Sequence, residues 1–147
     1  MRIAVVLAVA LPLAAIDLLV KAVRETPSWA YHDRSVGWLL TCAFVLAALV
    51  LVTRVPSLLV PPAAGVLAGG VLGNGLSAAA NDLSVPNPLV VTGGRAVVAF
   101  NLADVWVLTG LAILLTSIGV WLVRNRDLLP DRYDARRAMR RSLRRRD

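Results

Sequence analysis

Two carboxylates in apolar stretches are the side chains of this sequence best suited to chemistry, and Asp17 is the first. Lys21 follows it four residues later, one helical turn away on the same face. Ionisable groups inside a membrane-spanning helix are costly and by default indicate function. The alternative is an ion pair that lowers the cost of insertion, with Lys21 extending toward the membrane surface. The sequence leaves both interpretations open.

Asp104 is the second carboxylate, and it stands three residues after Asn101 at the head of another apolar run. This spacing predicts a helix start with Asn101 as the N-cap and Asp104 in the first turn, where a negative charge favours the helix dipole. A carboxylate at a helix start near the membrane surface can also face a water-accessible site. The two interpretations are compatible.

Metal chemistry and nucleophilic catalysis have few candidate residues here. Cys42 is the single cysteine and His32 the single histidine, so no intramolecular disulfide can form and we expect neither a metal site nor a cofactor. His32 belongs to a polar cluster that also contains Asp33 and Arg34. A serine nucleophile would need an activating base, and for Ser77 that base would have to be His32.

Four long apolar segments position these side chains, at about residues 3–23, 36–55, 57–76 and 104–123. Hydrophobic residues make up 58% of the 147 residues, against about 45–50% in soluble domains. A helix needs about 20 mostly apolar residues to cross a bilayer. The sequence therefore predicts an all-α integral membrane protein, with a four-helix bundle in residues 1–123. A cleaved signal peptide is the alternative for the first segment, but its apolar run continues past any Ala-rich cleavage site.

Small residues form a stripe in the third segment. Gly65, Gly69 and Gly73 recur at four-residue spacing, which predicts a face where a neighbouring helix backbone approaches closely. Leu67 lies off this stripe. If Leu67 faces lipid, another large apolar residue there should be tolerated better than one on the stripe.

The charge distribution predicts the topology. The net charge is +7, and residues 124–147 contain ten Arg and four Asp, so this segment is a basic tail. Basic residues favour the cytoplasmic side of membrane proteins. Both termini are therefore predicted to be cytoplasmic, with the tail beside anionic lipid and no nucleic-acid partner.

Residues 24–37 and 77–100 then form a small extracytoplasmic cap. It contains two short apolar patches, Leu89-Val90-Val91 and Ala96-Val97-Val98, separated by the turn signal Gly93-Gly94. The patches are predicted to lie along the outer membrane interface.

The sequence resembles the signal peptidase II family in three motifs. They are Asp17-Leu-Leu-Val-Lys21, Gly69-Gly70-Val-Leu-Gly73-Asn74, and Phe100-Asn101-Leu-Ala-Asp104 followed by Gly110. Their order and their places on the first, third and fourth segments agree with that family over about residues 3–123. The resemblance implies a lipoprotein signal peptidase, a four-helix intramembrane aspartic protease of the bacterial cytoplasmic membrane. Such an enzyme cleaves prolipoprotein signal peptides before a lipid-modified Cys.

Residue roles follow from the same resemblance. Asp104 matches one of the two catalytic Asp residues, and the resemblance implies substrate-binding or supporting roles for Asp17, Lys21, Asn74 and Asn101. At the position of the second catalytic Asp this sequence has Ser77, and the Arg that follows in the family is Ala78.

Asp82, five residues after Ser77, is therefore the expected second carboxylate. In an aspartic dyad one carboxylate accepts a proton from water while its protonated partner donates to the scissile group.

Three functions remain open from the sequence. The first is a divergent aspartic endopeptidase that uses Asp104 with Asp82. The second is a non-catalytic family member that binds lipoproteins or lipids. The third is a small proton-coupled transporter with Asp17 as its proton site.

Overall fold

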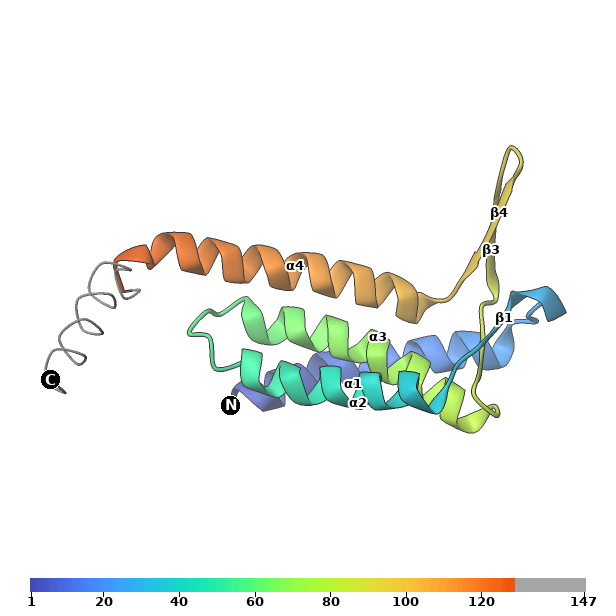
Figure 1. The fold of residues 1–147 in the computed structure, drawn as a ribbon, viewed down its shortest axis with the longest axis horizontal. Coiled ribbons are helices and arrows are strands. Elements are labelled where there is room, and N and C mark those ends of the chain that lie inside the picture. Colours follow the sequence, from blue (N-terminus) through green and yellow to red (C-terminus); the bar gives the residue numbers. More distant parts are fainter. Residues whose placement is uncertain (129–147) are drawn as a thin grey trace, which may run out of the picture.

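The computed structural model describes residues 1–128, which form four α-helices and two small antiparallel sheets. The helices are α1 (Arg2–Val23), α2 (Val36–Val52), α3 (Val60–Ala80) and α4 (Leu102–Arg124). They form an elongated bundle with the short strands gathered at one end (Figure 1). The four predicted helices are confirmed. Residues 129–147 of the predicted basic tail lie outside the described residues.

The four helices differ in whether they are long enough to cross a bilayer. Among the described residues, α1, α3 and α4 are long and apolar enough to cross a membrane. The α2 helix is apolar but has 17 residues, and at 1.5 Å rise per residue it spans about 26 Å, less than the roughly 30 Å hydrocarbon core. The fold is therefore compatible with a membrane protein, and α2 as a fourth span stays a prediction.

The prediction of an all-α fold was wrong for the cap. The β1 strand (Tyr31–Asp33) pairs antiparallel with β2 (Ser84–Pro86), which joins the two segments of the cap. The β3 strand (Leu89–Gly93) pairs with β4 (Ala96–Phe100) in a hairpin that projects sideways from the bundle (Figure 1). Its two valine pairs have high strand propensity, and Gly94 turns the chain with a φ of +59°. The two apolar patches of the cap are thus the arms of one hairpin.

The α3 helix is the centre of the bundle. In the most apolar 18-residue stretch of α3, 67% is buried, whereas only 17% is buried in the corresponding stretches of α1 and α4. It packs against α1, α2 and α4. Its many Ala and Gly residues make this placement possible, because small side chains allow neighbouring helix backbones to approach closely.

One face of α3 packs tightly against a neighbouring helix, as the glycine stripe predicts, and that neighbour is α1. A Cβ atom added at Gly65 would lie 2.8 Å from the Cβ of Val9, and one at Gly69 would lie 2.9 Å from the Cβ of Leu13. At Gly73 it would lie 2.7 Å from Oδ2 of Asp17. The stripe is therefore an interface that larger residues would disrupt.

Another face of α3 packs against α4. A Cβ at Gly70 would meet the backbone of Ala103, and one at Gly110 would meet the backbone of Leu67. Leu67 is 6% exposed, so it faces α4 rather than lipid.

Candidate functional site

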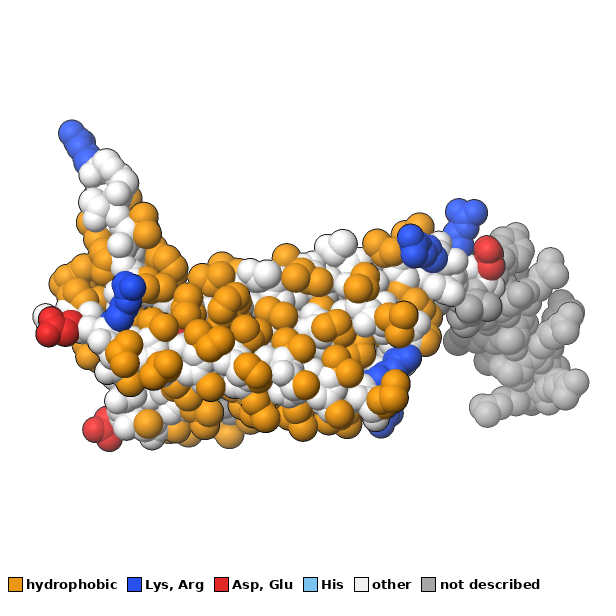
Figure 2. Space-filling model, turned by 180° about the vertical axis from the view of Figure 1, so that it is seen from behind, with side chains coloured by type: hydrophobic (Ala, Val, Ile, Leu, Met, Phe, Trp, Pro, Cys, Tyr) orange, Lys and Arg blue, Asp and Glu red, His pale blue; other side chains and the backbone are white. Residues whose placement is uncertain are grey.

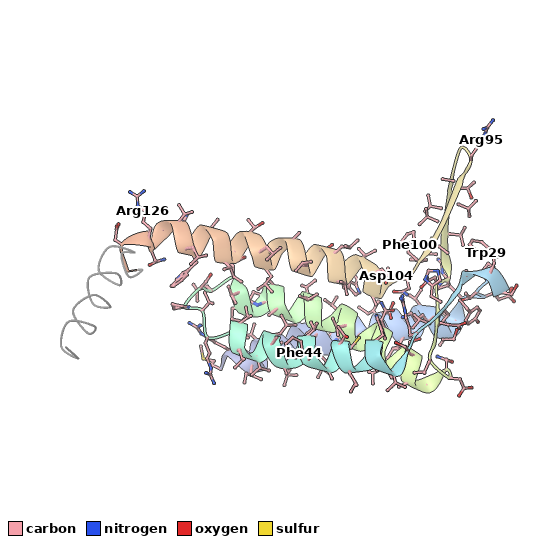
Figure 3. All side chains as sticks on the ribbon, in the orientation of Figure 1. Trp29, Phe44, Arg95, Phe100, Asp104 and Arg126 are labelled. Carbon is pink, nitrogen blue, oxygen red and sulfur yellow. The ribbon has the colours of Figure 1, made fainter. Side chains whose placement is uncertain are left out.

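Seven polar side chains from α1, α3, α4 and the cap form one continuous series of polar contacts. We call it the polar network; its members are Asp17, Lys21, Asn74, Asp104, Asn101, Asn87 and His32. It lies at the cap end of the bundle, where α4 begins beside the base of the hairpin (Figure 3).

The network begins with the ion pair on α1. Lys21 Nζ lies 2.7 Å from Asp17 Oδ2, and both side chains are buried. The four-residue spacing on one helix face brings them together. The ion pair, one of the two interpretations that the sequence left open, is present, and pairing offsets part of the cost of burying two charges.

Asp17 also links α1 to α4. Its Oδ1 accepts a hydrogen bond from the Ala103 backbone N–H at 2.8 Å. Ala103 lies in the first turn of α4, where backbone N–H groups have no partner within the helix. A side chain of α1 thus accepts a hydrogen bond from a backbone N–H that has no partner within α4.

Asn74 on α3 joins the ion pair to Asp104. Lys21 Nζ donates to Asn74 Oδ1 at 2.8 Å, and Asn74 Nδ2 donates to Asp104 Oδ1 at 2.9 Å. An ammonium group can donate but not accept, so it fixes the orientation of the Asn74 amide. Its NH₂ group then faces the carboxylate of Asp104.

Asp104 and Asn101 form the predicted start of α4. Asn101 Oδ1 accepts from the Asp104 N–H at 3.0 Å, and Asp104 Oδ2 accepts from the Asn101 N–H at 3.1 Å, which makes a capping box. Both carboxylate oxygens of Asp104 therefore accept hydrogen bonds, one from Asn74 and one from the backbone. The helix-start interpretation is confirmed.

The network continues into the cap. Asn101 Nδ2 donates to Asn87 Oδ1, and Asn87 Nδ2 lies 3.1 Å from Nδ1 of His32 on β1. Asn87 is 1% exposed and its backbone N–H donates to the Ala30 carbonyl at 3.1 Å. The cap is thus joined by side-chain hydrogen bonds to the buried residues of the bundle.

Ser77 and Asp82 lie outside this network. Ser77 is 2% exposed and follows Asn74 by three residues on the same face of α3. Asp82 is exposed in the turn after α3, where it and Leu83 have φ angles of 48° and 68°. Within residues 1–128, no hydrogen bond or ion pair joins Asp82 to Asp104, or Ser77 to His32.

This arrangement determines which chemistry the site supports. Asp104 is half-buried, and its hydrogen-bond donors are an amide and a backbone N–H, whereas an aspartic dyad needs a second carboxyl group beside it. Among the described residues, no group of three or more His, Cys, Asp or Glu side chains is placed to hold a metal ion. The geometry is that of a rigid hydrogen-bonded site with one carboxylate near the surface.

The resemblance predicted five of the seven network residues as site residues. Asn87 was not predicted as a member. His32 was considered as a base for Ser77, whereas it contacts Asn87. The turn signal around Asn87 indicated a loop but gave no information about its partner.

Figure 2 shows basic side chains at both ends of a bundle whose middle is covered by hydrophobic residues. At the end opposite the cap, Arg2 donates to the Thr53 and Val55 carbonyls, which ties the start of α1 to the loop after α2.

In comparisons with known proteins, no protein-family model, curated protein or solved structure matches this chain.

Proposed function

We propose that this protein is a signal peptidase II-like membrane protein that binds lipid-modified precursor proteins or lipids without cleaving them. The observation behind this proposal is the environment of Asp104. Its carboxylate is held by Asn74 and by the backbone of Asn101, and the α3 residue one turn beyond Asn74 is Ser77 rather than a second carboxylate. A single carboxylate cannot both accept a proton from water and donate one to the leaving group in a concerted dyad.

The assignment to a signal peptidase II-like protein rests on where the motif residues lie. The three motifs are far apart in sequence, yet Asp17, Lys21, Asn74, Asn101 and Asp104 meet in one network. This convergence supports the resemblance.

A membrane orientation is part of the proposal. Arg2 begins α1, Arg54 follows α2 and Arg124 ends α4, so these three side chains lie at the end opposite the cap. Under the positive-inside rule this end faces the cytoplasm. The network and the cap then face the outer side of the bacterial cytoplasmic membrane, where a lipid-modified precursor would be encountered.

The second candidate is the aspartic endopeptidase that uses Asp104 with Asp82. One observation favours it: the Asp82 turn lies at the same end of the bundle as Asp104 and consists of two residues in the left-handed region, which is strained for a leucine. Cleavage would require this turn to rearrange. The transporter has less support, because Asp17 is fully buried with one oxygen on Lys21 and the other on the Ala103 N–H.

The proposal is tested by binding. Full-length protein in detergent is titrated with a fluorescent precursor peptide, once with and once without its diacylglyceryl group on Cys. We expect the lipid-modified peptide to bind at least about tenfold more tightly, and to be recovered intact. Equal affinity for both peptides would contradict recognition of the lipid, and recovery of two fragments would support the endopeptidase instead.

A further inference from the structure

A cavity lies between α1 and α2 at the end of the bundle opposite the cap, where α1 begins and α2 ends (Figure 1). Both helices pack against α3, and the space between them has a volume of about 210 Å³. Its walls differ in exposure: Ala10 and Ala68 are buried, whereas Leu7 and Val50 are 47% and 46% exposed. The small alanine side chains leave the space, and the exposed residues bring it to the surface of the bundle between α1 and α2.

The walls of this cavity are suited to an apolar chain. All the lining residues except Thr53 are apolar, and the Thr53 hydroxyl donates to the Val50 carbonyl of its own helix at 2.7 Å. A purely apolar cavity of about 150 Å³ can stay dry and bind apolar molecules. Along α1 the walls extend from Ile3 to Ala10, a rise of about 10 Å, which fits within the roughly 15 Å hydrocarbon depth of one leaflet.

A second, wider space adjoins the cavity at the end of the bundle. Its volume is about 480 Å³, and it shares Ile3, Val50 and Thr53 with the cavity as walls. Arg2 and Arg54 also line it. Two guanidinium groups therefore stand where the apolar cavity reaches the end of the bundle. We call the cavity and this space together the α1–α2 groove.

The Arg2 side chain is positioned across the end of the groove. Its Nη1 donates to the carbonyls of Thr53 and Val55, and within residues 1–128 these two bonds are the hydrogen bonds of its side chain. A guanidinium group has five N–H donors, so those on Nε and Nη2 can serve a ligand. Such paired donors match the oxygens of a phosphate group. Arg54 is exposed and adds a second positive charge.

We propose that the α1–α2 groove binds an anionic phospholipid, with the phosphate at Arg2 and Arg54 and one acyl chain in the apolar cavity. Each half of the groove matches one half of such a lipid. A soluble anion would use the arginines but not the cavity, and an uncharged apolar molecule would use the cavity but not the arginines. Basic pockets between membrane helices on the cytoplasmic side bind anionic headgroups, and the proposed orientation places this end in the cytoplasm.

This inference goes beyond the proposed function, because it concerns a second site at the end of the bundle opposite the polar network. The residues that it uses are separate from that network, so either proposal can fail without the other.

Thermal unfolding of the full-length protein in detergent tests the proposal with three probes. They are dioctanoyl phosphatidylglycerol, dioctanoyl phosphatidylcholine and glycerophosphoglycerol, which is the phosphatidylglycerol headgroup without acyl chains. A ligand that binds the folded state raises the Tm. We expect phosphatidylglycerol to raise the Tm of the wild type well above the effect of either other probe at the same concentration.

Arg54→Gln removes one of the two charges and should need about fivefold more phosphatidylglycerol for the same rise in Tm. Arg95→Gln is the matched control, because Arg95 is an exposed arginine at the tip of the hairpin, at the other end of the protein (Figure 3). It should respond like the wild type.

A second pair of variants tests the place of the acyl chain. Val50 and Leu51 are neighbours on α2 and both are exposed, but Val50 lines both spaces of the groove and Leu51 lines neither. Val50→Trp should obstruct the groove and weaken the response to phosphatidylglycerol. Leu51→Trp adds the same bulk outside the groove and should leave the response unchanged.

The proposal is overturned if phosphatidylglycerol does not raise the Tm of the wild type, or if phosphatidylcholine or the headgroup alone raises it equally. It is also overturned if Arg54→Gln responds like the wild type or like Arg95→Gln, or if Val50→Trp and Leu51→Trp respond alike.

Discussion

The carboxylate of Asp17 on α1 accepts a hydrogen bond from the backbone N–H of Ala103 in the first turn of α4, at 2.8 Å. The other oxygen of the same carboxylate pairs with Lys21 at 2.7 Å. One buried side chain therefore connects two helices and balances the charge of a lysine. The start of α4, which positions Asp104, depends on this contact.

Replacing Asp17 with Asn should destabilise the protein strongly. The amide oxygen can still accept from Ala103, but Lys21 keeps its charge and loses its counter-ion. Leaving one member of a buried ion pair uncompensated costs about 3–5 kcal/mol. Unfolding of the purified protein in detergent, by heat or denaturant, measures this loss.

The double variant Asp17→Asn, Lys21→Met is the control for that experiment. It removes both charges and should recover much of the stability, because replacing both members of a buried pair is far less costly than replacing one. A double variant as unstable as Asp17→Asn alone would show that charge balance is not the reason for the effect.

The interface between α1 and α3 gives a second prediction. Gly69→Ala places a methyl group 2.9 Å from the Cβ of Leu13, and such overpacking should cost about 1–3 kcal/mol. Gly75 lies on the same helix, but there an added Cβ meets its nearest neighbour, Cys42, at 4.0 Å. Gly75→Ala should therefore be neutral, or stabilise by up to about 1 kcal/mol through higher helix propensity. Equal changes in unfolding free energy for both variants would argue against the glycine stripe as a tight interface.

Topology is tested with reporter fusions in a bacterial host. Alkaline phosphatase, which is active outside the cytoplasm, should be active when inserted at Gly94 in the tip of the hairpin and inactive when fused after Asp147. A fluorescent protein that folds in the cytoplasm should give the reverse pattern. An accessible C-terminus on the outside would contradict both the orientation and the proposed location of the site.

The parts of the fold that sequence predicted correctly are local. The apolar runs predicted the four helices, and Asp17 with Lys21 and Asn101 with Asp104 lie within four residues of each other, so helix geometry alone brings them together. The glycine spacing predicted a tight interface on α3, though not that α1 is the partner. Contacts within one helical turn follow from periodicity, and the choice of neighbour does not.

The parts that sequence did not predict depend on distant contacts. Asn87 meets His32 across 55 residues, and no local pattern determines such a pair. Asn74 and Asp104 lie 30 residues apart, and only the resemblance placed them in one site. The hairpin is a different case, since valines on both sides of Gly93-Gly94 are a strand signal that was interpreted as two separate patches. Arg34 was noted within a polar cluster, but its position over the Trp38 ring is visible only in three dimensions.

We propose that this site lacks the second carboxylate of an aspartic dyad, because the resemblance aligns Ser77 with that carboxylate. A carboxylate introduced at Ser77 should then create activity. The comparison needs four purified proteins: the wild type, Ser77→Asp, Ser77→Asp with Asp104→Asn, and Asp82→Asn. Each is checked for folding by its unfolding transition.

Cleavage of a lipid-modified prolipoprotein by these four proteins is the most direct measurement. We predict no cleavage by the wild type or by Asp82→Asn, detectable cleavage by Ser77→Asp, and loss of that cleavage when Asp104→Asn is added, because a dyad needs both carboxyl groups. Cleavage by the wild type that disappears in Asp82→Asn would contradict the account and establish Asp82 as the second carboxylate.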